Sequence, residues 1–449
     1  SPETKIGKIQ DWDVQKYLNK EVDTYYIDDD TITKENLKEY LDKSKFSVAS
    51  NGVLYRTDEV GCIPGILDLW FKKRVEYKDE MVKYGKAGDN DKYAFYHKRQ
   101  LVQKILLNSL YGVLGLPAFR FYDVDNATAV TTTGQTVIKS TADMANIKYN
   151  KELGTPDLDS NIYIDTDSVF FSAVPLMDKR FPNWKDEEQN TIAGYVNDIA
   201  SEMQDYLNDF YDIMSKKIFN VDVDKHRLEI KMENVAKAGL WIAKKRYAQW
   251  IISDNGVPCD KLDVKGLDVK RSSFPKAFQE CMGKVLIDIL KGVGEEELTK
   301  YVLDFKKNME NRPNSEIAKN TAVKNLKKYM PKGKRVPFTT MKGTPAHVKA
   351  AIAYNDLITH FKVPFKYGPM VNGDKVKWVY LKDNPLGLDG LAFTGYNDPP
   401  EIEKFIETYI DRNKIFEREL RFKLQDFYDA IGWGEMISEQ KTAEKFFTF

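Results

Sequence analysis

Several features that would define other classes of protein are scarce or missing in this sequence of 449 residues. Only three cysteines occur, Cys62, Cys259 and Cys281, and they are far apart with no C-x-x-C pair. They are read as free thiols in a reducing cytosol, because a disulfide framework needs closely spaced pairs. No apolar run reaches about 18 residues, so no membrane span is expected. Residues 1–15 are polar and charged and show no signal-peptide pattern, which favours a cytoplasmic protein.

An excess of charge is also missing, since 68 basic residues balance 68 acidic ones. Locally, "KNLKKYMPKGKR" (324–335) contains basic residues and no acid. Two interpretations stay open for it, a solvated loop or a patch that contacts phosphates. The three adjacent carboxylates of "IDDD" (27–30) point in different directions, so no metal site is expected there. With 42% apolar and 30% charged residues, the chain is a globular mix long enough for two or three domains.

Hydrophobic spacing predicts the order of helices and strands. Residues 1–60 read as short strands and loops, with a hairpin over 51–61. Helical spacing begins at Ile63, stops near Gly88 and resumes from Asp91 to Gly112, which predicts a helical hairpin. A shift in composition near Pro275 marks the expected domain boundary. The other predicted segments are a helix from about Thr132, two strands within 161–174, a helix over 187–217, strands over 226–268, and mostly helical stretches to Asn308 and over 399–428.

Two aspartates, Asp165 and Asp167, stand two residues apart in the otherwise apolar run "NIYIDTDSVFFSAV" (161–174). The flanking residues predict strands, which places "DTD" at the tip of a tight hairpin. Alternation puts both carboxylates on one face if the backbone stays extended. Carboxylates that close repel each other unless a cation holds them. The alternative is an Asx turn without a ligand.

Basic and amide side chains recur at helical spacing within the expected helical hairpin. Arg74 and Lys78 are four apart, as are Lys104 and Asn108, with Tyr111 further along the same face. An asparagine and a tyrosine inside an apolar run are costly to bury without partners. Such a hairpin could present cations and an amide to a triphosphate. An ordinary helix surface is the alternative.

Taken together, the motifs resemble those of family B DNA polymerases. "YIDTDS" is similar to the family's C motif, YGDTDS, with Ile164 in place of glycine. "QKILLNSLYG" matches its B motif, K-x-x-x-N-S-x-Y-G, and "RVEYK" fits the upstream R-x-x-x-K. The chain looks most like the replicative polymerases of T-even-like bacteriophages. Further similar segments are "AKKRYA" (243–248), the palm-to-thumb stretch 265–276, the thumb stretch 344–355 and the palm strand 228–239.

The resemblance implies an α+β fold with the right-hand architecture of polymerases. That fold combines an antiparallel palm sheet with helices, a helical-hairpin fingers domain and a mostly helical thumb. The implied boundaries are 1–61 for the first part of the palm, 62–116 for the fingers, 117–274 for the palm with the C motif and the KKRY element, and 275–449 for the thumb and its tail.

The resemblance also implies residue roles in nucleotide addition. Asp167 would be the principal ligand and Asp165 the supporting ligand of two Mg²⁺ ions, with Glu233 as a further acid and Glu229 as its competitor. The implied phosphate-binding and catalytic residues of the fingers are Arg74, Lys78, Lys104 and Asn108, with Tyr111 near the nascent base pair and Lys104 neutralising charge or donating a proton.

DNA and clamp contacts follow from the same likeness. Lys244, Lys245, Arg246 and Tyr247 would track the primer strand in the minor groove, and Lys265 would add a DNA contact. In phage enzymes the last residues bind a sliding clamp, which points to Phe446, Phe447 and Phe449. A tail packed on its own thumb is the alternative.

One family element is missing from residues 1–70, the A motif D-x-x-S-L-Y-P-S. The exonuclease domain, which lies upstream in the family, is not found either. The expectation is therefore a C-terminal part that needs an N-terminal partner chain carrying the A-motif aspartate and possibly the exonuclease. It would use deoxynucleoside triphosphates and primer–template DNA in the cytoplasm of a host cell. A non-catalytic DNA- and clamp-binding fragment is the alternative, and a natural split, intein or protease processing, or an artificial cut stay open.

Overall fold

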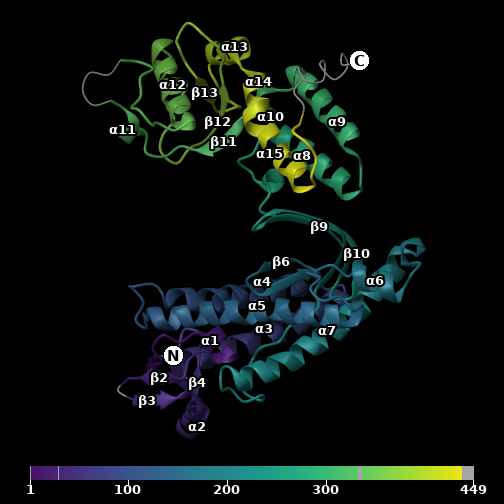
Figure 1. The fold of residues 1–449 in the computed structure, drawn as a ribbon. Helices are drawn as coiled ribbons and strands as arrows, with labels where there is room; N and C mark the ends of the chain where they lie inside the picture. The colour runs from purple at the N-terminus through teal and green to yellow at the C-terminus, as the bar shows by residue number, and fades with distance from the viewer. Residues whose placement is uncertain (1, 29, 332–335, 437–449) are drawn as a thin grey trace. The chain divides into compact units, whose positions relative to one another are not determined.

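The computed structural model describes residues 2–28, 30–331 and 336–436. The chain divides into two compact units, residues 1–233 and 234–449 (Figure 1), and each is described by itself. The division falls before Pro275, because the sheet that follows Glu233 shares its core with the helices after Pro275. No helix in the described ranges is long and apolar enough to cross a membrane.

A small antiparallel sheet opens the first unit, with β5 between β1 and β4. The hairpin expected over 51–61 is displaced, because β5 is its second strand and pairs back to β4. Gly52 in the turn has φ +83°, and a Cβ there would lie 2.5 Å from the carbonyl oxygen of Ile9, so only glycine fits. The elements are η1 (Pro2–Thr4), β1 (Lys5–Lys8), α1 (Val14–Asn19), β2 (Thr24–Ile27), β3 (Asp30–Thr33), α2 (Lys34–Ser44), β4 (Phe46–Val48) and β5 (Val53–Arg56).

The predicted helical hairpin is present as α3 (Cys62–Lys86) and α4 (Asn90–Val113). The break falls at Gly88, whose φ of +73° no ordinary helix residue adopts. Asp89 caps α4 by accepting a hydrogen bond from the backbone N–H of Lys92 at 3.1 Å. Local signals therefore sufficed to place both helices.

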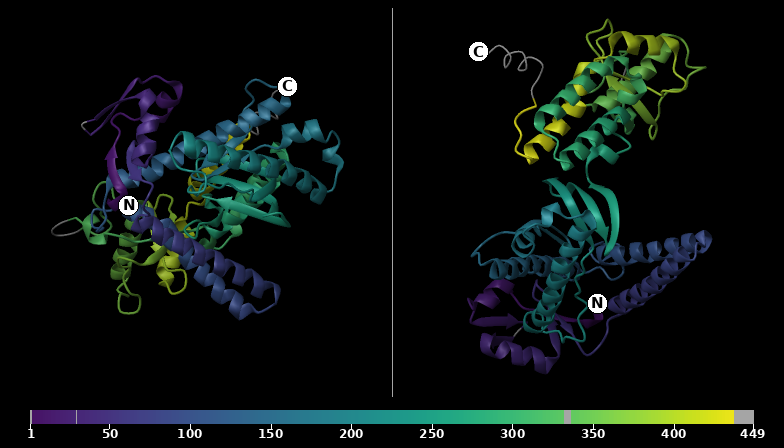
Figure 2. Two further views of the ribbon diagram at one scale, coloured as in Figure 1. Left: turned by 90° about the horizontal axis from the view of Figure 1, so that it is seen from below. Right: turned by 90° about the vertical axis from the view of Figure 1, so that its right-hand side faces the viewer.

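Few side chains of this hairpin are buried. No residue of α4 and only Ile63 of α3 is buried in the described structure, and Figure 2 shows the two helices extending away from the rest of the first unit. Aromatic contacts join the helices instead, including stacked rings of Tyr84 and Tyr96 with centroids 5.5 Å apart. The placement of the hairpin therefore depends on how its two ends are held.

The helix predicted from about Thr132 starts earlier, as α5 (Val124–Leu153). Its cap is Asp123, which accepts from the backbone N–H of Asn126 at 3.1 Å. The threonine run does not break the helix, because its hydroxyls donate back to carbonyls one turn earlier, such as Thr132 Oγ1 to Thr128 O at 2.8 Å.

The aspartate hairpin rests on a helical layer. Tyr149 of α5 is buried and contacts Phe171 of the hairpin edge to face at 5.6 Å. Met177 of α6 and Met203 of α7 belong to the same core, so three helices form the layer on which the hairpin packs. The elements are β6 (Asn161–Asp165), β7 (Ser168–Phe171), α6 (Val174–Arg180), η2 (Trp184–Asp186) and α7 (Gln189–Lys217).

Arg180 ties this helical layer together. Its Nε and Nη2 donate to Glu152 of α5 at 2.6 and 2.8 Å, and its Nη1 and Nη2 donate to Glu202 of α7 at 3.0 and 2.8 Å. The hydrogen bonds from Arg180 lower the pKa of both carboxyls below their ordinary value. Such fork geometry is among the stronger side-chain interactions.

We expect Arg180→Met to lower the free energy of unfolding by about 1–2 kcal/mol at pH 7, since the partly buried Glu152 loses its charged donor, while the exposed Glu202 is screened by solvent and adds little. Because both carboxyl pKa values are lowered in the folded state, the contribution is full above their unfolded value of roughly 4.3. The stabilisation is lost as the pH falls through the pKa values that the two carboxyls have in the folded state. Urea unfolding at pH 7 and pH 3.5 measures the difference. Lys185→Met, which removes an exposed pair with Asp178, is the control and should change little.

The second unit begins with a three-stranded antiparallel sheet in the order β10–β9–β8. Leu240 and Ala248 from this sheet enter one core with Phe278 and Val285 of the following helix. The elements are β8 (Asn234–Ala243), β9 (Arg246–Asp254), β10 (Val257–Lys265), η3 (Asp268–Lys270), α8 (Lys276–Leu290), α9 (Glu295–Asn308), η4 (Met309–Asn311) and α10 (Asn314–Ile317).

The region expected to be mostly helical also contains a sheet. Its strands pair antiparallel in the order β11–β12–β13, and α12 packs against β13. Strand β11 has only four residues and two helices separate it from β12 in the chain, so local spacing did not reveal their pairing. The elements are β11 (Lys319–Ala322), α11 (Leu326–Tyr329), α12 (Ala346–His360), β12 (Lys375–Tyr380), β13 (Gly390–Phe393), α13 (Pro400–Tyr409), α14 (Arg412–Ile415), η5 (Phe416–Arg421) and α15 (Phe422–Ala430).

Candidate active site

Asp165 and Asp167 lie at the predicted hairpin tip. Asp165 is the last residue of β6 and pairs with Ser168, the first of β7. The backbone N–H of Asp167 donates to the carbonyl of Asp165 at 2.6 Å, which closes the turn. Asp165 is half-buried and accepts from Thr166 Oγ1 at 3.0 Å, whereas the Asp167 side chain is exposed. Two carboxylates are thus held on a short, rigid turn.

The turn does not stay extended, so the alternation argument does not apply. Thr166 has φ +54°, in the left-handed region. Ile164, which replaces the family's glycine, lies two residues before Thr166, within β6 and opposite Val169. A β-branched residue suits that position, so the substitution leaves both acids in place.

The structure brings two acids together here and not three. No group of three histidine, cysteine or acidic side chains able to hold a metal occurs among the described residues. Glu229 and Glu233, the candidates for a third acid, are exposed in the segment before β8, and Glu229 pairs with Lys231 at 3.0 Å. The role of Glu233 stays a prediction.

The basic face of the helical hairpin lies in the open. Lys78 of α3 and Lys104, Asn108 and Tyr111 of α4 are all exposed, with Tyr111 at 48%. The expected cost of burying Asn108 and Tyr111 therefore does not arise. The spacing of Lys104, Asn108 and Tyr111 still places these three side chains along α4, where they can face a shared anionic ligand.

Arg74 differs from its neighbours because part of its guanidinium is buried. Its Nε is shielded from solvent and has no hydrogen-bond partner within the part of the chain that the structure describes. A buried donor without a partner costs free energy, which an anionic ligand could recover. Among the predicted phosphate-binding residues, Arg74 thus gives the clearest structural indication of an anionic ligand.

The first two residues of the KKRY element form the turn between β8 and β9, and its last two are the first residues of β9. Lys244 and Lys245 are exposed at the tip, and Lys245 has φ +62°. Arg246 is engaged elsewhere, since its Nη2 donates to Asp426 of α15 at 2.9 Å. Tyr247 is buried and stacks on Trp241 at 6.2 Å. The element thus divides into two exposed lysines and two residues that hold the turn.

Gly266 supports this turn from the neighbouring strand. It has φ +65°, and a Cβ there would lie 2.0 Å from the carbonyl oxygen of Lys245. Only glycine allows that approach. The adjacent Lys265 is exposed and pairs with Asp263 at 3.2 Å. The sequence analysis marked 265–276 only as a stretch similar to the family, and nothing in it predicted that Gly266 approaches Lys245.

A basic and aromatic pocket in the second unit was missed by the sequence analysis. Its volume is about 270 Å³. The Lys414 ammonium lies 5.5 Å and the Arg418 guanidinium 5.8 Å from the Tyr380 ring centre. Burial raises the pKa of the Tyr380 hydroxyl, which stays neutral. Lys349 pairs across the rim with Asp389 at 3.5 Å. The four-residue spacing of Lys414 and Arg418 was the available signal.

Some predicted residues lie outside the described ranges. These are Phe446, Phe447 and Phe449 of the expected clamp-binding tail, and residues 332–335 of the basic stretch. Within the rest of that stretch, Lys324, Lys327 and Lys328 are exposed around α11, so both interpretations of the stretch stay open.

Comparison with known proteins gives one consistent result. The sequence profile of DNA polymerase family B matches residues 22–181 and 197–411. The DNA-directed DNA polymerase of Enterobacteria phage T4 is 30% identical over 361 residues, covering 77% of this chain and 38% of the phage protein. That of Escherichia phage RB69 is 26% identical over 446 residues, covering 86% and 48%.

A further relative comes from an archaeon. The DNA polymerase of Thermococcus gorgonarius is 27% identical over 318 residues, covering 70% of this chain and 34% of that protein. The chain thus spans less than half the length of each of these three relatives. The likeness to phage enzymes of family B, first indicated by the motifs, is confirmed.

Proposed function

Because the chain belongs to DNA polymerase family B, we propose that it carries the nucleotide-adding site of a template-directed DNA polymerase. The observation that carries the proposal is the Asp165–Asp167 pair at the tip of a hairpin whose strands pack on a helical layer. The exposed basic face of α3 and α4 supplies the complementary charge for a triphosphate. Arg74, Lys78, Lys104 and Asn108 bind the phosphates, and Tyr111 packs near the new base pair.

The reaction is an in-line phosphoryl transfer. The primer 3′-hydroxyl oxygen forms a bond to the α-phosphorus as the bond from that phosphorus to the bridging oxygen breaks. Pyrophosphate leaves with the electron pair of the broken bond, and the hydroxyl proton passes to solvent. Lys104 neutralises negative charge that grows on the phosphates, or donates a proton to the leaving group.

Two Mg²⁺ ions are the proposed cofactors, and the two carboxylates at the hairpin tip are ligands of the type they need, although too few to hold both ions. Mg²⁺ prefers oxygen ligands, and Asp167 offers an exposed carboxylate that no other described residue bonds. When bound, such ions stabilise the attacking and leaving oxygens. Asp167 would be the main ligand, Asp165 the supporting one and Glu233 a further candidate.

We further propose that a partner segment supplies another carboxylate. The motif D-x-x-S-L-Y-P-S is not found in residues 1–70. β6 and β7 form a two-stranded sheet, so within the described chain their outer edges have no strand partner. A segment carrying that motif can add to such an edge. An N-terminal polymerase part, possibly with the exonuclease, is the proposed partner.

Primer–template DNA is proposed to lie across the second unit's basic surfaces. Lys244 and Lys245 reach the backbone from the exposed turn, while Arg246 and Tyr247 keep that turn in place. Lys265 lies next to this turn in the sheet. The pocket of Lys414 and Arg418 offers a further phosphate contact.

Separate mutants test whether nucleotide and duplex use different surfaces. We expect Lys104→Ala to raise KM for the nucleotide and slow incorporation about tenfold or more, with little change in duplex affinity. Lys245→Ala should mainly weaken duplex binding and lower its salt dependence by about one phosphate contact. Single-nucleotide incorporation and DNA titrations at several salt concentrations give the result. Equal effects of both variants on DNA affinity would contradict the two-surface proposal.

A sliding clamp is the last proposed partner. Phe446, Phe447 and Phe449 are anchors of the kind that dock in an apolar pocket. The enzyme would act in the cytoplasm of a phage-infected host. A non-catalytic DNA- and clamp-binding role would need no acid pair, which is why the catalytic role is preferred.

A further inference from the structure

Both ends of the α3–α4 hairpin are tied to the same short N-terminal segment. At the start of α3, the cap position is Gly61, which has no side chain to cap the helix. The carboxylate of Glu3 serves instead, accepting from the backbone N–H of Cys62 at 2.5 Å. A negative charge at this end also suits the helix dipole.

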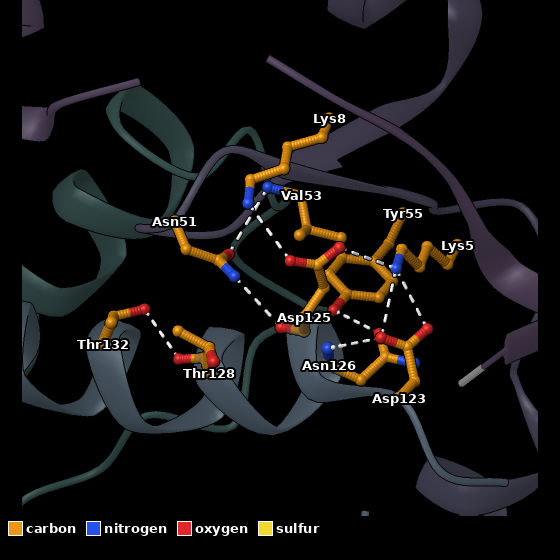
Figure 3. A network of polar contacts seen from close by, with 10 residues as sticks. All are labelled: Lys5, Lys8, Asn51, Val53, Tyr55, Asp123, Asp125, Asn126, Thr128 and Thr132. Atoms are coloured by element: carbon orange, nitrogen blue, oxygen red, sulfur yellow. Dashed lines mark hydrogen bonds and ion pairs between the residues drawn. The ribbon is translucent and has the colours of Figure 1, made fainter. Parts of the chain in front are cut away.

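The other end is held by Lys5, two residues later. The chain leaves α4 and comes back to its end at Asp123, whose backbone N–H donates to the carbonyl of Leu114 at 2.9 Å, so the exit of the hairpin is fixed to the start of α5. Asp123 caps α5 and Asp125 lies in its first turn. Lys5 Nζ lies 3.1 and 3.0 Å from the two carboxylate oxygens of Asp123 and 3.1 Å from Asp125 Oδ2. Figure 3 shows Lys5 pointing between these two carboxylates. Glu3 and Lys5 thus connect the entry and the exit of one hairpin.

Further hydrogen bonds join the start of α5 to β5 and to the turn before it. Tyr55 Oη donates to Asn126 Oδ1 at 2.7 Å, and Asn51 Nδ2 donates to the carbonyl of Asp125 at 3.0 Å (Figure 3). Burial, and then the charges of Asp123 and Asp125, raise the pKa of Tyr55, so its hydroxyl stays a donor. The start of α5 is therefore fixed to the sheet and not only to Lys5.

Lys5 is the central charge of this network. Its side chain is 24% exposed and that of Asp123 22%, whereas Lys8, whose one ion pair among the described residues is with Asp125, is 48% exposed. Burial lowers the pKa of Lys5, but its bonds to Asp123 and Asp125 outweigh this and raise it overall. Shielded pairs contribute more than exposed ones, so Lys5 matters more than Lys8.

We infer that residues 3–8 form a clasp that sets the spacing between the two ends of the α3–α4 hairpin. This inference rests on the proposed function in one respect, that Lys5 acts as a positioning residue for the phosphate-binding side chains of that hairpin. The hairpin buries only Ile63 among its described residues, so its direction is set at its ends. A loosened clasp leaves the helices intact and lets them point elsewhere.

Hydrogen–deuterium exchange of the chain alone tests the clasp without any nucleotide. We expect Lys5→Met to speed exchange about tenfold at the start of α3 and across 114–128, with the cores of α5 and α7 unchanged. Lys5→Arg should restore slow exchange. Lys38→Met, which removes an exposed pair with Asp42, is the matched control. No local change, or a uniform rise across the first unit, would overturn the clasp.

Steady-state incorporation by the active polymerase tests the positioning role. If the correctly directed hairpin becomes a minor population, apparent affinity falls in proportion. We expect Lys5→Met to raise KM for the nucleotide about fivefold to tenfold with kcat within about twofold, and Lys5→Arg to reverse it. A lower kcat with unchanged KM would mean lost folded enzyme and would overturn the positioning role. The exchange experiment uses the chain without nucleotide or catalysis. It therefore tests the clasp even if the proposed polymerase function is wrong.

Discussion

Asp167→Ala is expected to lower primer extension by about a thousandfold or more while duplex affinity stays within a few-fold. A carboxylate that holds Mg²⁺ acts on charge that develops in the transition state, and several kcal/mol of such stabilisation correspond to about three powers of ten in rate. Asp167 is exposed at the turn and makes no side-chain bond within the described structure, so folding should not suffer. Labelled-primer extension with the complete polymerase is the measurement.

A matched variant tests whether the effect of Asp167→Ala comes from the metal site or from loss of any surface carboxylate. Asp157 is also an exposed aspartate in a loop of the first unit, so Asp157→Ala removes the same charge from the same unit. It should leave extension unchanged. Full extension by Asp167→Ala would remove the acid pair from the mechanism, and a collapse in DNA affinity would assign Asp167 to binding instead.

The second large effect concerns the chain by itself. We expect it to bind primer–template DNA but to add no nucleotide. The described structure gathers two acids at the hairpin tip and no third acidic, histidine or cysteine side chain joins them. Two ions held by too few carboxylates are badly placed, and a displacement of about 1 Å costs roughly a hundredfold in rate. Weak metal occupancy adds to that loss.

Local signals explain what could be predicted from the sequence. The helical hairpin follows from apolar spacing along both helices and from Gly88 at the break between them. The aspartate turn follows from β-branched and aromatic residues on both sides of "DTD". In each case the residues that decide the structure are neighbours in the chain.

Contacts between distant residues explain what could not be predicted. The cap of α3 comes from Glu3, 59 residues earlier, where no local pattern reveals it. Arg246 bonds Asp426, 180 residues away, so the KKRY element turned out to be only partly exposed. Strand β11 pairs with β12 although α11 and α12 lie between them in the chain. Spacing along the chain carries no information about such partners.

The central claim is that the Asp165–Asp167 hairpin adds nucleotides once a further acid from a partner segment is supplied. The most direct measurement is Mg²⁺-dependent extension of a labelled primer by this chain alone, by an upstream part carrying D-x-x-S-L-Y-P-S alone, and by their mixture. We predict extension only in the mixture, loss of that extension with Asp167→Ala, and co-elution of the two chains on a sizing column. Robust Mg²⁺-dependent extension by this chain alone, or none in a co-eluting mixture, would contradict the account.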